Sequence, residues 1–124
     1  MRHYFIKDEM YRFHVDLFVN CTKEQVISRI QKKYNFELKD EHNRVFGGSA
    51  GYYDSKECSV IWVRSFNWSV NDVAAVDHEI THHMFRALGL VGIKPCDETE
   101  EAYAYYHEYI YAKVIKKLNK IPET

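Results

Sequence analysis

The spacing of apolar residues changes along this chain, and that change limits the folds open to it. Between Tyr11 and Val19, apolar side chains alternate with polar ones, which is typical of a half-buried β-strand. From Val26, and again from Val73, they recur every three or four residues, as on one face of a helix. A chain that carries both periods in separate segments favours an α+β fold, with a small sheet covered by helices.

The same patterns give the expected elements, in order along the chain. Strands are predicted at residues 4–6, 11–19, 52–53 and 58–63, and the last two would form a hairpin. Helices are predicted at about 22–34, 69–88 and 98–118, and a polar loop at 36–51. Capping-box spacing marks the first two helix starts, at Thr22 with Gln25 and at Ser69 with Asp72. We expect a mostly antiparallel sheet with one helix packed on it and two further helices in the C-terminal half.

Length and composition exclude several classes of protein. With 124 residues, 46 % of them hydrophobic, the chain is expected to form a single domain over residues 1–124. Seventeen basic residues balance eighteen acidic ones, which argues against binding driven by nucleic-acid phosphates or an anionic membrane. We find neither a secretory signal nor a membrane-spanning run. The three cysteines, Cys21, Cys58 and Cys96, have no CxxC pairing and suit reduced thiols in the cytoplasm.

The most informative motif is His-Glu-Ile-Thr-His at residues 78–82, inside the second-last predicted helix. Positions i and i+4 share one helix face, so the imidazoles of His78 and His82 can reach the same metal ion. Glu79 stands beside the first of them, where its carboxylate could accept a proton from a metal-bound water. With this chain's own composition, roughly 0.03 accidental matches are expected. The motif therefore predicts a metal site.

The surroundings of the motif support this interpretation. The helix carries an apolar stripe, made of Val73, Val76, Ile80, Met84 and Leu88. His78 and His82 lie on a different face, flanked by Ala75 and Phe85, so we expect the helix to be buried between the sheet and other helices. Two histidines and a glutamate on a buried face are costly unless a cation satisfies them.

A catalytic zinc site needs a third protein ligand and one open position. The downstream candidates are Cys96, Asp97, Glu98, Glu100, Glu101 and His107. If zinc were structural instead, a fourth protein ligand such as Cys96 or His83 would close the site. His83 adjoins His82 but projects about 100° away around the helix, which places it near the metal or at the surface.

The downstream segment resembles a known motif. Thr99-Glu-Glu-Ala-Tyr-Ala-Tyr105 is similar to the second motif of gluzincin-type zincin metallopeptidases, in which the glutamate before the alanine is the third zinc ligand. The resemblance implies that Glu101 has this role. More closely, the segments 60–63, 78–82 and 100–105 resemble short zincin-like proteins of tailed phages and prophages. This implies a minimal zincin fold, a Zn²⁺ cofactor and a place in the cytoplasm of a bacterial or phage-infected cell.

Two functional hypotheses follow. In the first, the chain is a zinc metallopeptidase: His78, His82 and Glu101 hold the metal, and Glu79 is the general base for a zinc-bound water that attacks a peptide or protein substrate. The strand that contains Trp62 would pair with the extended substrate. In the second, the chain is a non-catalytic zincin-fold module with structural zinc, which serves in phage assembly or host interaction.

Overall fold

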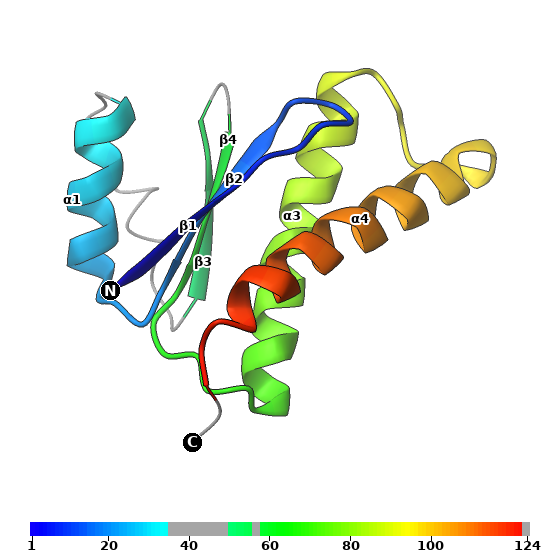
Figure 1. Ribbon diagram of the computed structural model, residues 1–124. Coiled ribbons are helices and arrows are strands. Elements are labelled where there is room, and N and C mark those ends of the chain that lie inside the picture. The colour runs from blue at the N-terminus through cyan, green and yellow to red at the C-terminus, as the bar shows by residue number, and fades with distance from the viewer. Residues whose placement is uncertain (35–49, 56–57, 123–124) are drawn as a thin grey trace.

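The computed structural model describes residues 1–34, 50–55 and 58–122, and these form a four-stranded sheet with helices on both faces (Figure 1). The elements are, in order, β1 (Arg2–Ile6), β2 (His14–Val19), α1 (Lys23–Tyr34), β3 (Ala50–Asp54), β4 (Cys58–Val63), α3 (Val70–Leu90), the 3₁₀ helix η1 (Asp97–Thr99) and α4 (Glu100–Leu118). The predicted α+β class is confirmed. Most of the loop predicted at residues 36–51 lies outside the described residues. None of the helices in the described ranges has the length and apolar character needed to cross a bilayer.

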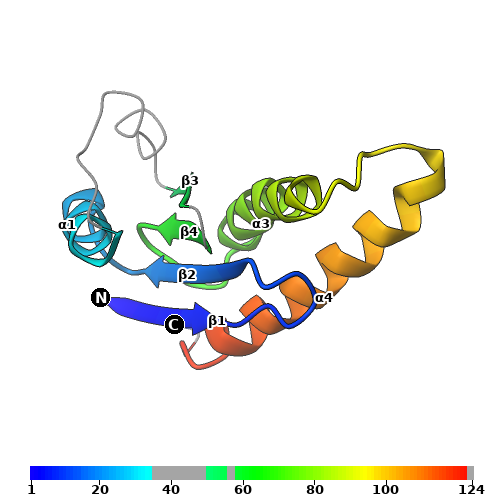
Figure 2. The same ribbon diagram turned by 90° about the horizontal axis from the view of Figure 1, so that it is seen from above.

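The sheet is mixed, with strand order β1-β2-β4-β3 (Figure 2). β1 pairs antiparallel with β2 and β3 pairs antiparallel with β4, as the predicted hairpin requires. β2 and β4, however, run parallel in the centre. The expectation of a mostly antiparallel sheet therefore holds for the two outer pairs and misses the central one. A parallel pair needs a crossover connection, and α1 lies in the segment that connects β2 to the β3–β4 hairpin.

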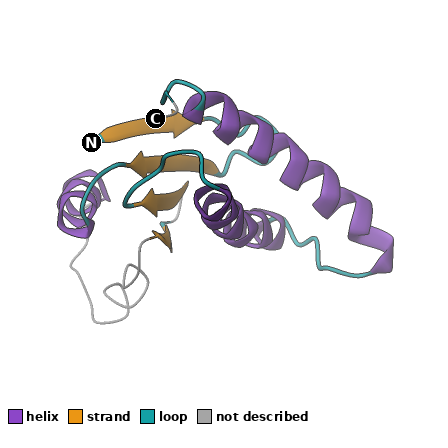
Figure 3. Ribbon diagram, turned by 90° about the horizontal axis from the view of Figure 1, so that it is seen from below, coloured by secondary structure: helices purple, strands orange, loops and turns teal. Residues whose placement is uncertain are grey.

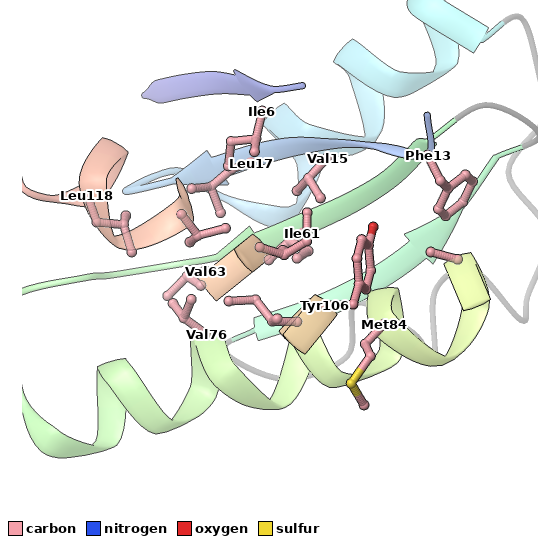
Figure 4. Packing of buried hydrophobic residues seen from close by; sticks show 14 of the residues in the cluster. Ile6, Phe13, Val15, Leu17, Ile61, Val63, Val76, Met84, Tyr106 and Leu118 are labelled. Atoms are coloured by element: carbon pink, nitrogen blue, oxygen red, sulfur yellow. The ribbon is translucent and has the colours of Figure 1, made fainter. Parts of the chain in front are cut away.

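Alternate residues of each strand face opposite sides of the sheet, and each side has its own helical cover (Figure 3). On one side α1 packs over a small core, made of Phe18, Cys21, Val26, Ile27, Ile30, Val60 and Trp62. On the other side α3 and α4 cover a larger core, to which β4 contributes Ile61 and Val63 (Figure 4). Because β4 contributes side chains to both cores, it is buried along its whole length.

The larger core confirms the apolar stripe predicted on α3. Val76, Ile80, Met84 and Leu88 are buried in it, and Val73 packs against it while partly exposed. The matching face of α4 carries Tyr103, Tyr106, Ile110, Val114 and Leu118. Both predicted capping boxes are present, at Thr22 with Gln25 and at Ser69 with Asp72.

β2 begins at His14, three residues later than predicted. Asp8 causes this difference, because its carboxylate accepts hydrogen bonds from the backbone N–H groups of Met10, Tyr11 and Phe13. Arg12 has a φ of 59°, in the left-handed region. The alternating pattern therefore starts inside a turn, which Asp8 holds closed.

On the α1 side, a buried carboxylate ties α1 to the sheet. Asp16 of β2 is fully buried and accepts hydrogen bonds from Lys33 Nζ at 2.7 Å and from the Tyr34 hydroxyl, and it pairs with His3 Nε2 at 2.8 Å. Burial alone would raise the pKa of Asp16, but these hydrogen bonds and the Lys33 charge outweigh it and hold the pKa far below its ordinary value. Cys58 lies next to this group, and burial raises the pKa of its thiol. It is thus an inert core cysteine.

Candidate functional site

The two histidines of the HExxH motif lie side by side on α3. The ring centroids of His78 and His82 are 5.0 Å apart, with the rings nearly perpendicular. Both side chains are exposed, so the expectation that they occupy a buried face is wrong. The reason is that, among the described residues, the face of α3 that packs against the sheet and α4 is its apolar stripe and not the face of the two histidines. Two neighbouring imidazoles open to solvent can serve as two ligands of one metal ion.

Glu79 lies between them in sequence, about 100° around the helix from His78, and unlike them it is buried. Only 7 % of its surface is exposed. Burial raises the pKa of its carboxyl group, and the neighbouring His78 partly offsets that rise. Partial shielding of the His82 ring from solvent lowers its pKa, and His78 adds to that effect. A buried carboxylate with raised proton affinity, next in sequence to one of two paired imidazoles, has the chemistry of a general base beside a metal site.

The edge strand β3 runs next to this part of α3. The ring of Tyr52 stacks on that of His82, with centroids 5.4 Å apart, and Arg86 Nε pairs with Asp54 Oδ2 at 2.7 Å. β4, which contains Trp62, is paired on both sides, with β2 and with β3. The predicted pairing of this strand with a substrate is therefore wrong. Within the described ranges, β1 pairs with β2 alone and β3 with β4 alone, so these are the two edge strands, and β3 is the one that contacts His82.

Glu101 is in the first turn of α4 and is exposed. It lies about 140° around the helix from Tyr106, which faces the core. Figures 1 and 2 both show this turn at the end of α4 that projects away from the sheet. Among the described residues, no three His, Cys, Asp or Glu side chains gather as a metal site would need. The structure therefore brings His78 and His82 together and does not add Glu101 to them, and its role as ligand stays a prediction.

His83 has a place that the sequence did not indicate. It is fully buried, and both of its ring nitrogens are hydrogen-bonded: Nδ1 with Ser59 Oγ at 2.6 Å and Nε2 with the Tyr106 hydroxyl at 2.8 Å. It therefore has no free nitrogen with which to close a structural zinc site. The hydrogen bonds continue at both ends, from Tyr106 to Asp8 Oδ2 at 2.6 Å and from Ser59 to the Tyr52 hydroxyl at 2.7 Å. We call these five residues the core hydrogen-bond chain.

A cavity of about 580 Å³ opens on the α4 side of α3. Its lining is Trp68, Val70, Val73, Ala74, Asp77, His107 and Tyr111. His107 was a candidate third ligand, but its Nε2 is hydrogen-bonded to Asp77 Oδ1 at 2.7 Å. Asp77 directly precedes His78 in sequence. The cavity thus offers a mostly apolar surface, with one polar pair, near the first histidine.

The fold and the site together define a small α+β protein with an exposed HExxH histidine pair beside an edge strand. Comparisons with known protein families, with curated proteins and with solved structures find no match to this chain. Its likeness to zincin metallopeptidases therefore rests on the motif residues.

Proposed function

We propose that this protein is a zinc-dependent peptidase in which His78 and His82 are two of the metal ligands and Glu79 is the general base. The observation that carries the proposal is the pair of exposed rings 5.0 Å apart on one turn of α3, with a buried carboxylate between them in sequence. When bound, Zn²⁺ would supply a Lewis acid that polarises a peptide carbonyl and acidifies water. The described residues fit two ligands of such an ion, and the resemblance implies Glu101 as the third.

Glu79 suits the role of base because of its surroundings. Burial raises the pKa of its carboxyl group, so it holds a proton more readily than an exposed glutamate does. A group of this kind can take a proton from an attacking water and return it to the leaving amine. In this proposal Glu79, next to His78 in sequence, acts beside the metal ligands and is not one of them.

The neighbouring surfaces support a peptide as substrate. β3 lies against α3 at Tyr52 and Asp54, and an extended peptide could add to its outer edge through backbone hydrogen bonds. The cavity beside Asp77 has room for an apolar side chain of that peptide. Tyr52 of β3 contacts His82, and Asp77 in the lining of the cavity directly precedes His78 in sequence.

One observation favours a second candidate, a zinc-binding module without catalytic activity. The third ligand of a catalytic site is not present next to the pair among the described residues. A metal held by two exposed histidines could then be completed by a group from a binding partner. This candidate predicts zinc binding without hydrolysis.

Metal content and zinc titration test the shared part of both candidates. Protein purified without added metal should contain or take up one zinc per chain, and His82→Ala should abolish this uptake. Glu101→Gln should weaken zinc binding and Glu100→Gln should not, because the two side chains point about 100° apart. The reverse result would move the ligand by one residue. Failure of the wild-type protein to bind zinc would refute both candidates.

Cleavage of a peptide library separates the two. Wild-type protein loaded with zinc should hydrolyse peptides, and Glu79→Gln, with equal zinc content, should not, since an amide cannot accept the proton. Equal cleavage by both proteins would refute Glu79 as the base. Zinc binding without any cleavage would favour the module.

A further inference from the structure

We propose that Tyr52 is a positioning residue for His82, and that the core hydrogen-bond chain holds Tyr52 in place from the opposite side of the core. The proposal rests on the proposed function in one respect, because it takes His82 to be a metal ligand. It assigns a role to Asp8, Tyr106, His83 and Ser59, which the peptidase hypothesis does not use.

The core hydrogen-bond chain crosses the core from the β1–β2 turn to the edge strand β3. Asp8, Tyr106, His83 and Ser59 have no exposed surface, and Tyr52 at the far end is partly exposed. Each link is between 2.6 and 2.8 Å long. Buried links of this length are stronger than exposed ones and hold their donors and acceptors in one geometry.

Which group donates in each hydrogen bond of the core hydrogen-bond chain follows from its end at Asp8. The Asp8 carboxylate accepts from three backbone N–H groups, so the Tyr106 hydroxyl must donate to it. The Tyr106 oxygen then accepts from Nε2–H of His83, which leaves Nδ1 of that ring as an acceptor. Ser59 donates to Nδ1 and accepts from the Tyr52 hydroxyl. Every donor therefore points towards Asp8, and His83 is the Nε2–H tautomer.

At its other end, the core hydrogen-bond chain reaches the proposed metal site, where Tyr52 contacts His82. With its hydroxyl committed to Ser59, the Tyr52 ring cannot swing away from α3 without leaving buried groups unsatisfied. That ring stacks on His82 at 5.4 Å, with an angle of 28° between the planes. The last side-chain torsion of a histidine has a broad range unless a neighbour restricts it. Tyr52 thus sets the plane of His82, and the ring of His78 lies at 74° to that plane.

Pre-orientation of a ligand ring raises metal affinity, and loss of groups that orient metal ligands typically costs 10–100-fold. Tyr52→Phe keeps the ring and removes its anchor, so we expect the zinc Kd to rise about tenfold. Ser59→Ala removes the hydrogen-bond partner of the Tyr52 hydroxyl and leaves the Tyr52 side chain intact, so it should have the same effect. The matched control is Tyr34→Phe, which also removes a tyrosine hydroxyl bonded to a buried group, Asp16, but on the other side of the sheet.

The experiment measures zinc Kd by competition with a chromophoric chelator, together with the melting temperature of the zinc-free proteins. The proposal predicts that all three variants melt lower and that only Tyr52→Phe and Ser59→Ala bind zinc more weakly. An unchanged Kd in Tyr52→Phe would overturn it. Equal weakening in Tyr34→Phe would also overturn it, because the effect would then be general destabilisation.

NMR of the zinc-free protein tests the proposal independently of metal binding. The His83 ring should be protonated at Nε2 and not at Nδ1. The opposite tautomer would refute the donor order proposed for the core hydrogen-bond chain. The ring protons of His82 should carry a shift from the Tyr52 ring that shrinks in Tyr52→Phe and persists in Tyr34→Phe. A shift that persists in Tyr52→Phe would overturn the positioning role. If the wild-type protein bound no zinc, the proposed function would fail, and these NMR results would still decide whether Tyr52 orients His82.

Discussion

Acid should destabilise this protein through one buried imidazole. His83 lies between Ser59 and Tyr106 with no exposed surface, and burial lowers its pKa to about 4. Asp8 opposes this change and His14 adds to it. In the unfolded chain the same ring titrates near 6.5. Between these two values the unfolded state binds a proton that the folded state does not, so the free energy of unfolding must fall as the pH falls.

The size of the effect follows from the two pKa values. Each pKa unit corresponds to about 1.4 kcal/mol. A His83 pKa of about 4 in the folded state, against 6.5 ordinarily, therefore contributes about 3 kcal/mol to the free energy of unfolding. This stability is fully present above pH 6.5 and is lost progressively as the pH falls to about 4. It is a large fraction of the roughly 5–15 kcal/mol that stabilises a typical domain.

Urea unfolding of the wild-type protein and of His83→Gln between pH 7.5 and 4 measures this contribution of His83 to the free energy of unfolding. Glutamine can still donate and accept within the core but does not titrate. The variant should be less stable at pH 7.5, and the advantage of the wild type should shrink by about 3 kcal/mol towards pH 4. His107→Gln is the control, since His107 is half-buried at the surface. Parallel pH curves for wild type and His83→Gln would refute the reasoning.

Two further predictions concern the other buried polar groups. Asp16→Asn should lower the free energy of unfolding by about 3 kcal/mol at pH 7, because it leaves the groups around Asp16 without their charged partner. Since the pKa of folded Asp16 lies far below its ordinary value, this difference should hold above about pH 4 and decline below it, which unfolding at pH 7 and pH 3 would check. Tyr106→Phe should cost about 3 kcal/mol or more, because Asp8 and His83 both lose a buried partner. Tyr103→Phe, which loses a bond to the Ile93 carbonyl, should cost only about 1 kcal/mol. Equal melting temperatures for the two tyrosine variants would contradict this.

The parts of the fold that could be predicted are those with local signals. Both capping boxes and the apolar stripe of α3 follow from residues within a few positions of one another, and the structure confirms them. The start of β2 could not be found in this way. The alternation from Tyr11 continues through a turn whose cause is the Asp8 carboxylate, and a pattern of apolar residues does not record that interaction.

In the candidate site, too, only the features with a local sequence signal could be predicted. The i, i+4 spacing of His78 and His82 correctly predicted neighbouring rings, since helix geometry alone sets it. Which side of α3 would be covered depended on the packing of α4 and β3, so the burial of the pair was predicted wrongly. His83 had partners 24 and 23 residues away, Ser59 and Tyr106, and its role in the core was out of reach of local reasoning.

The two tryptophans fall in different layers of the molecule. Trp62 is fully buried in the core under α1, where its indole N–H donates to the Cys21 carbonyl. Trp68 precedes α3 on the opposite side and donates to the carbonyl of Ile121, just after α4. The chain thus carries one tryptophan for each face of its sheet. Because the parallel β2–β4 pairing joins residues more than forty positions apart, its closure should be slow relative to helix formation. In refolding, the Trp62 signal is expected to report the closure of the sheet, and the Trp68 signal the docking of the end of α4 beside the start of α3.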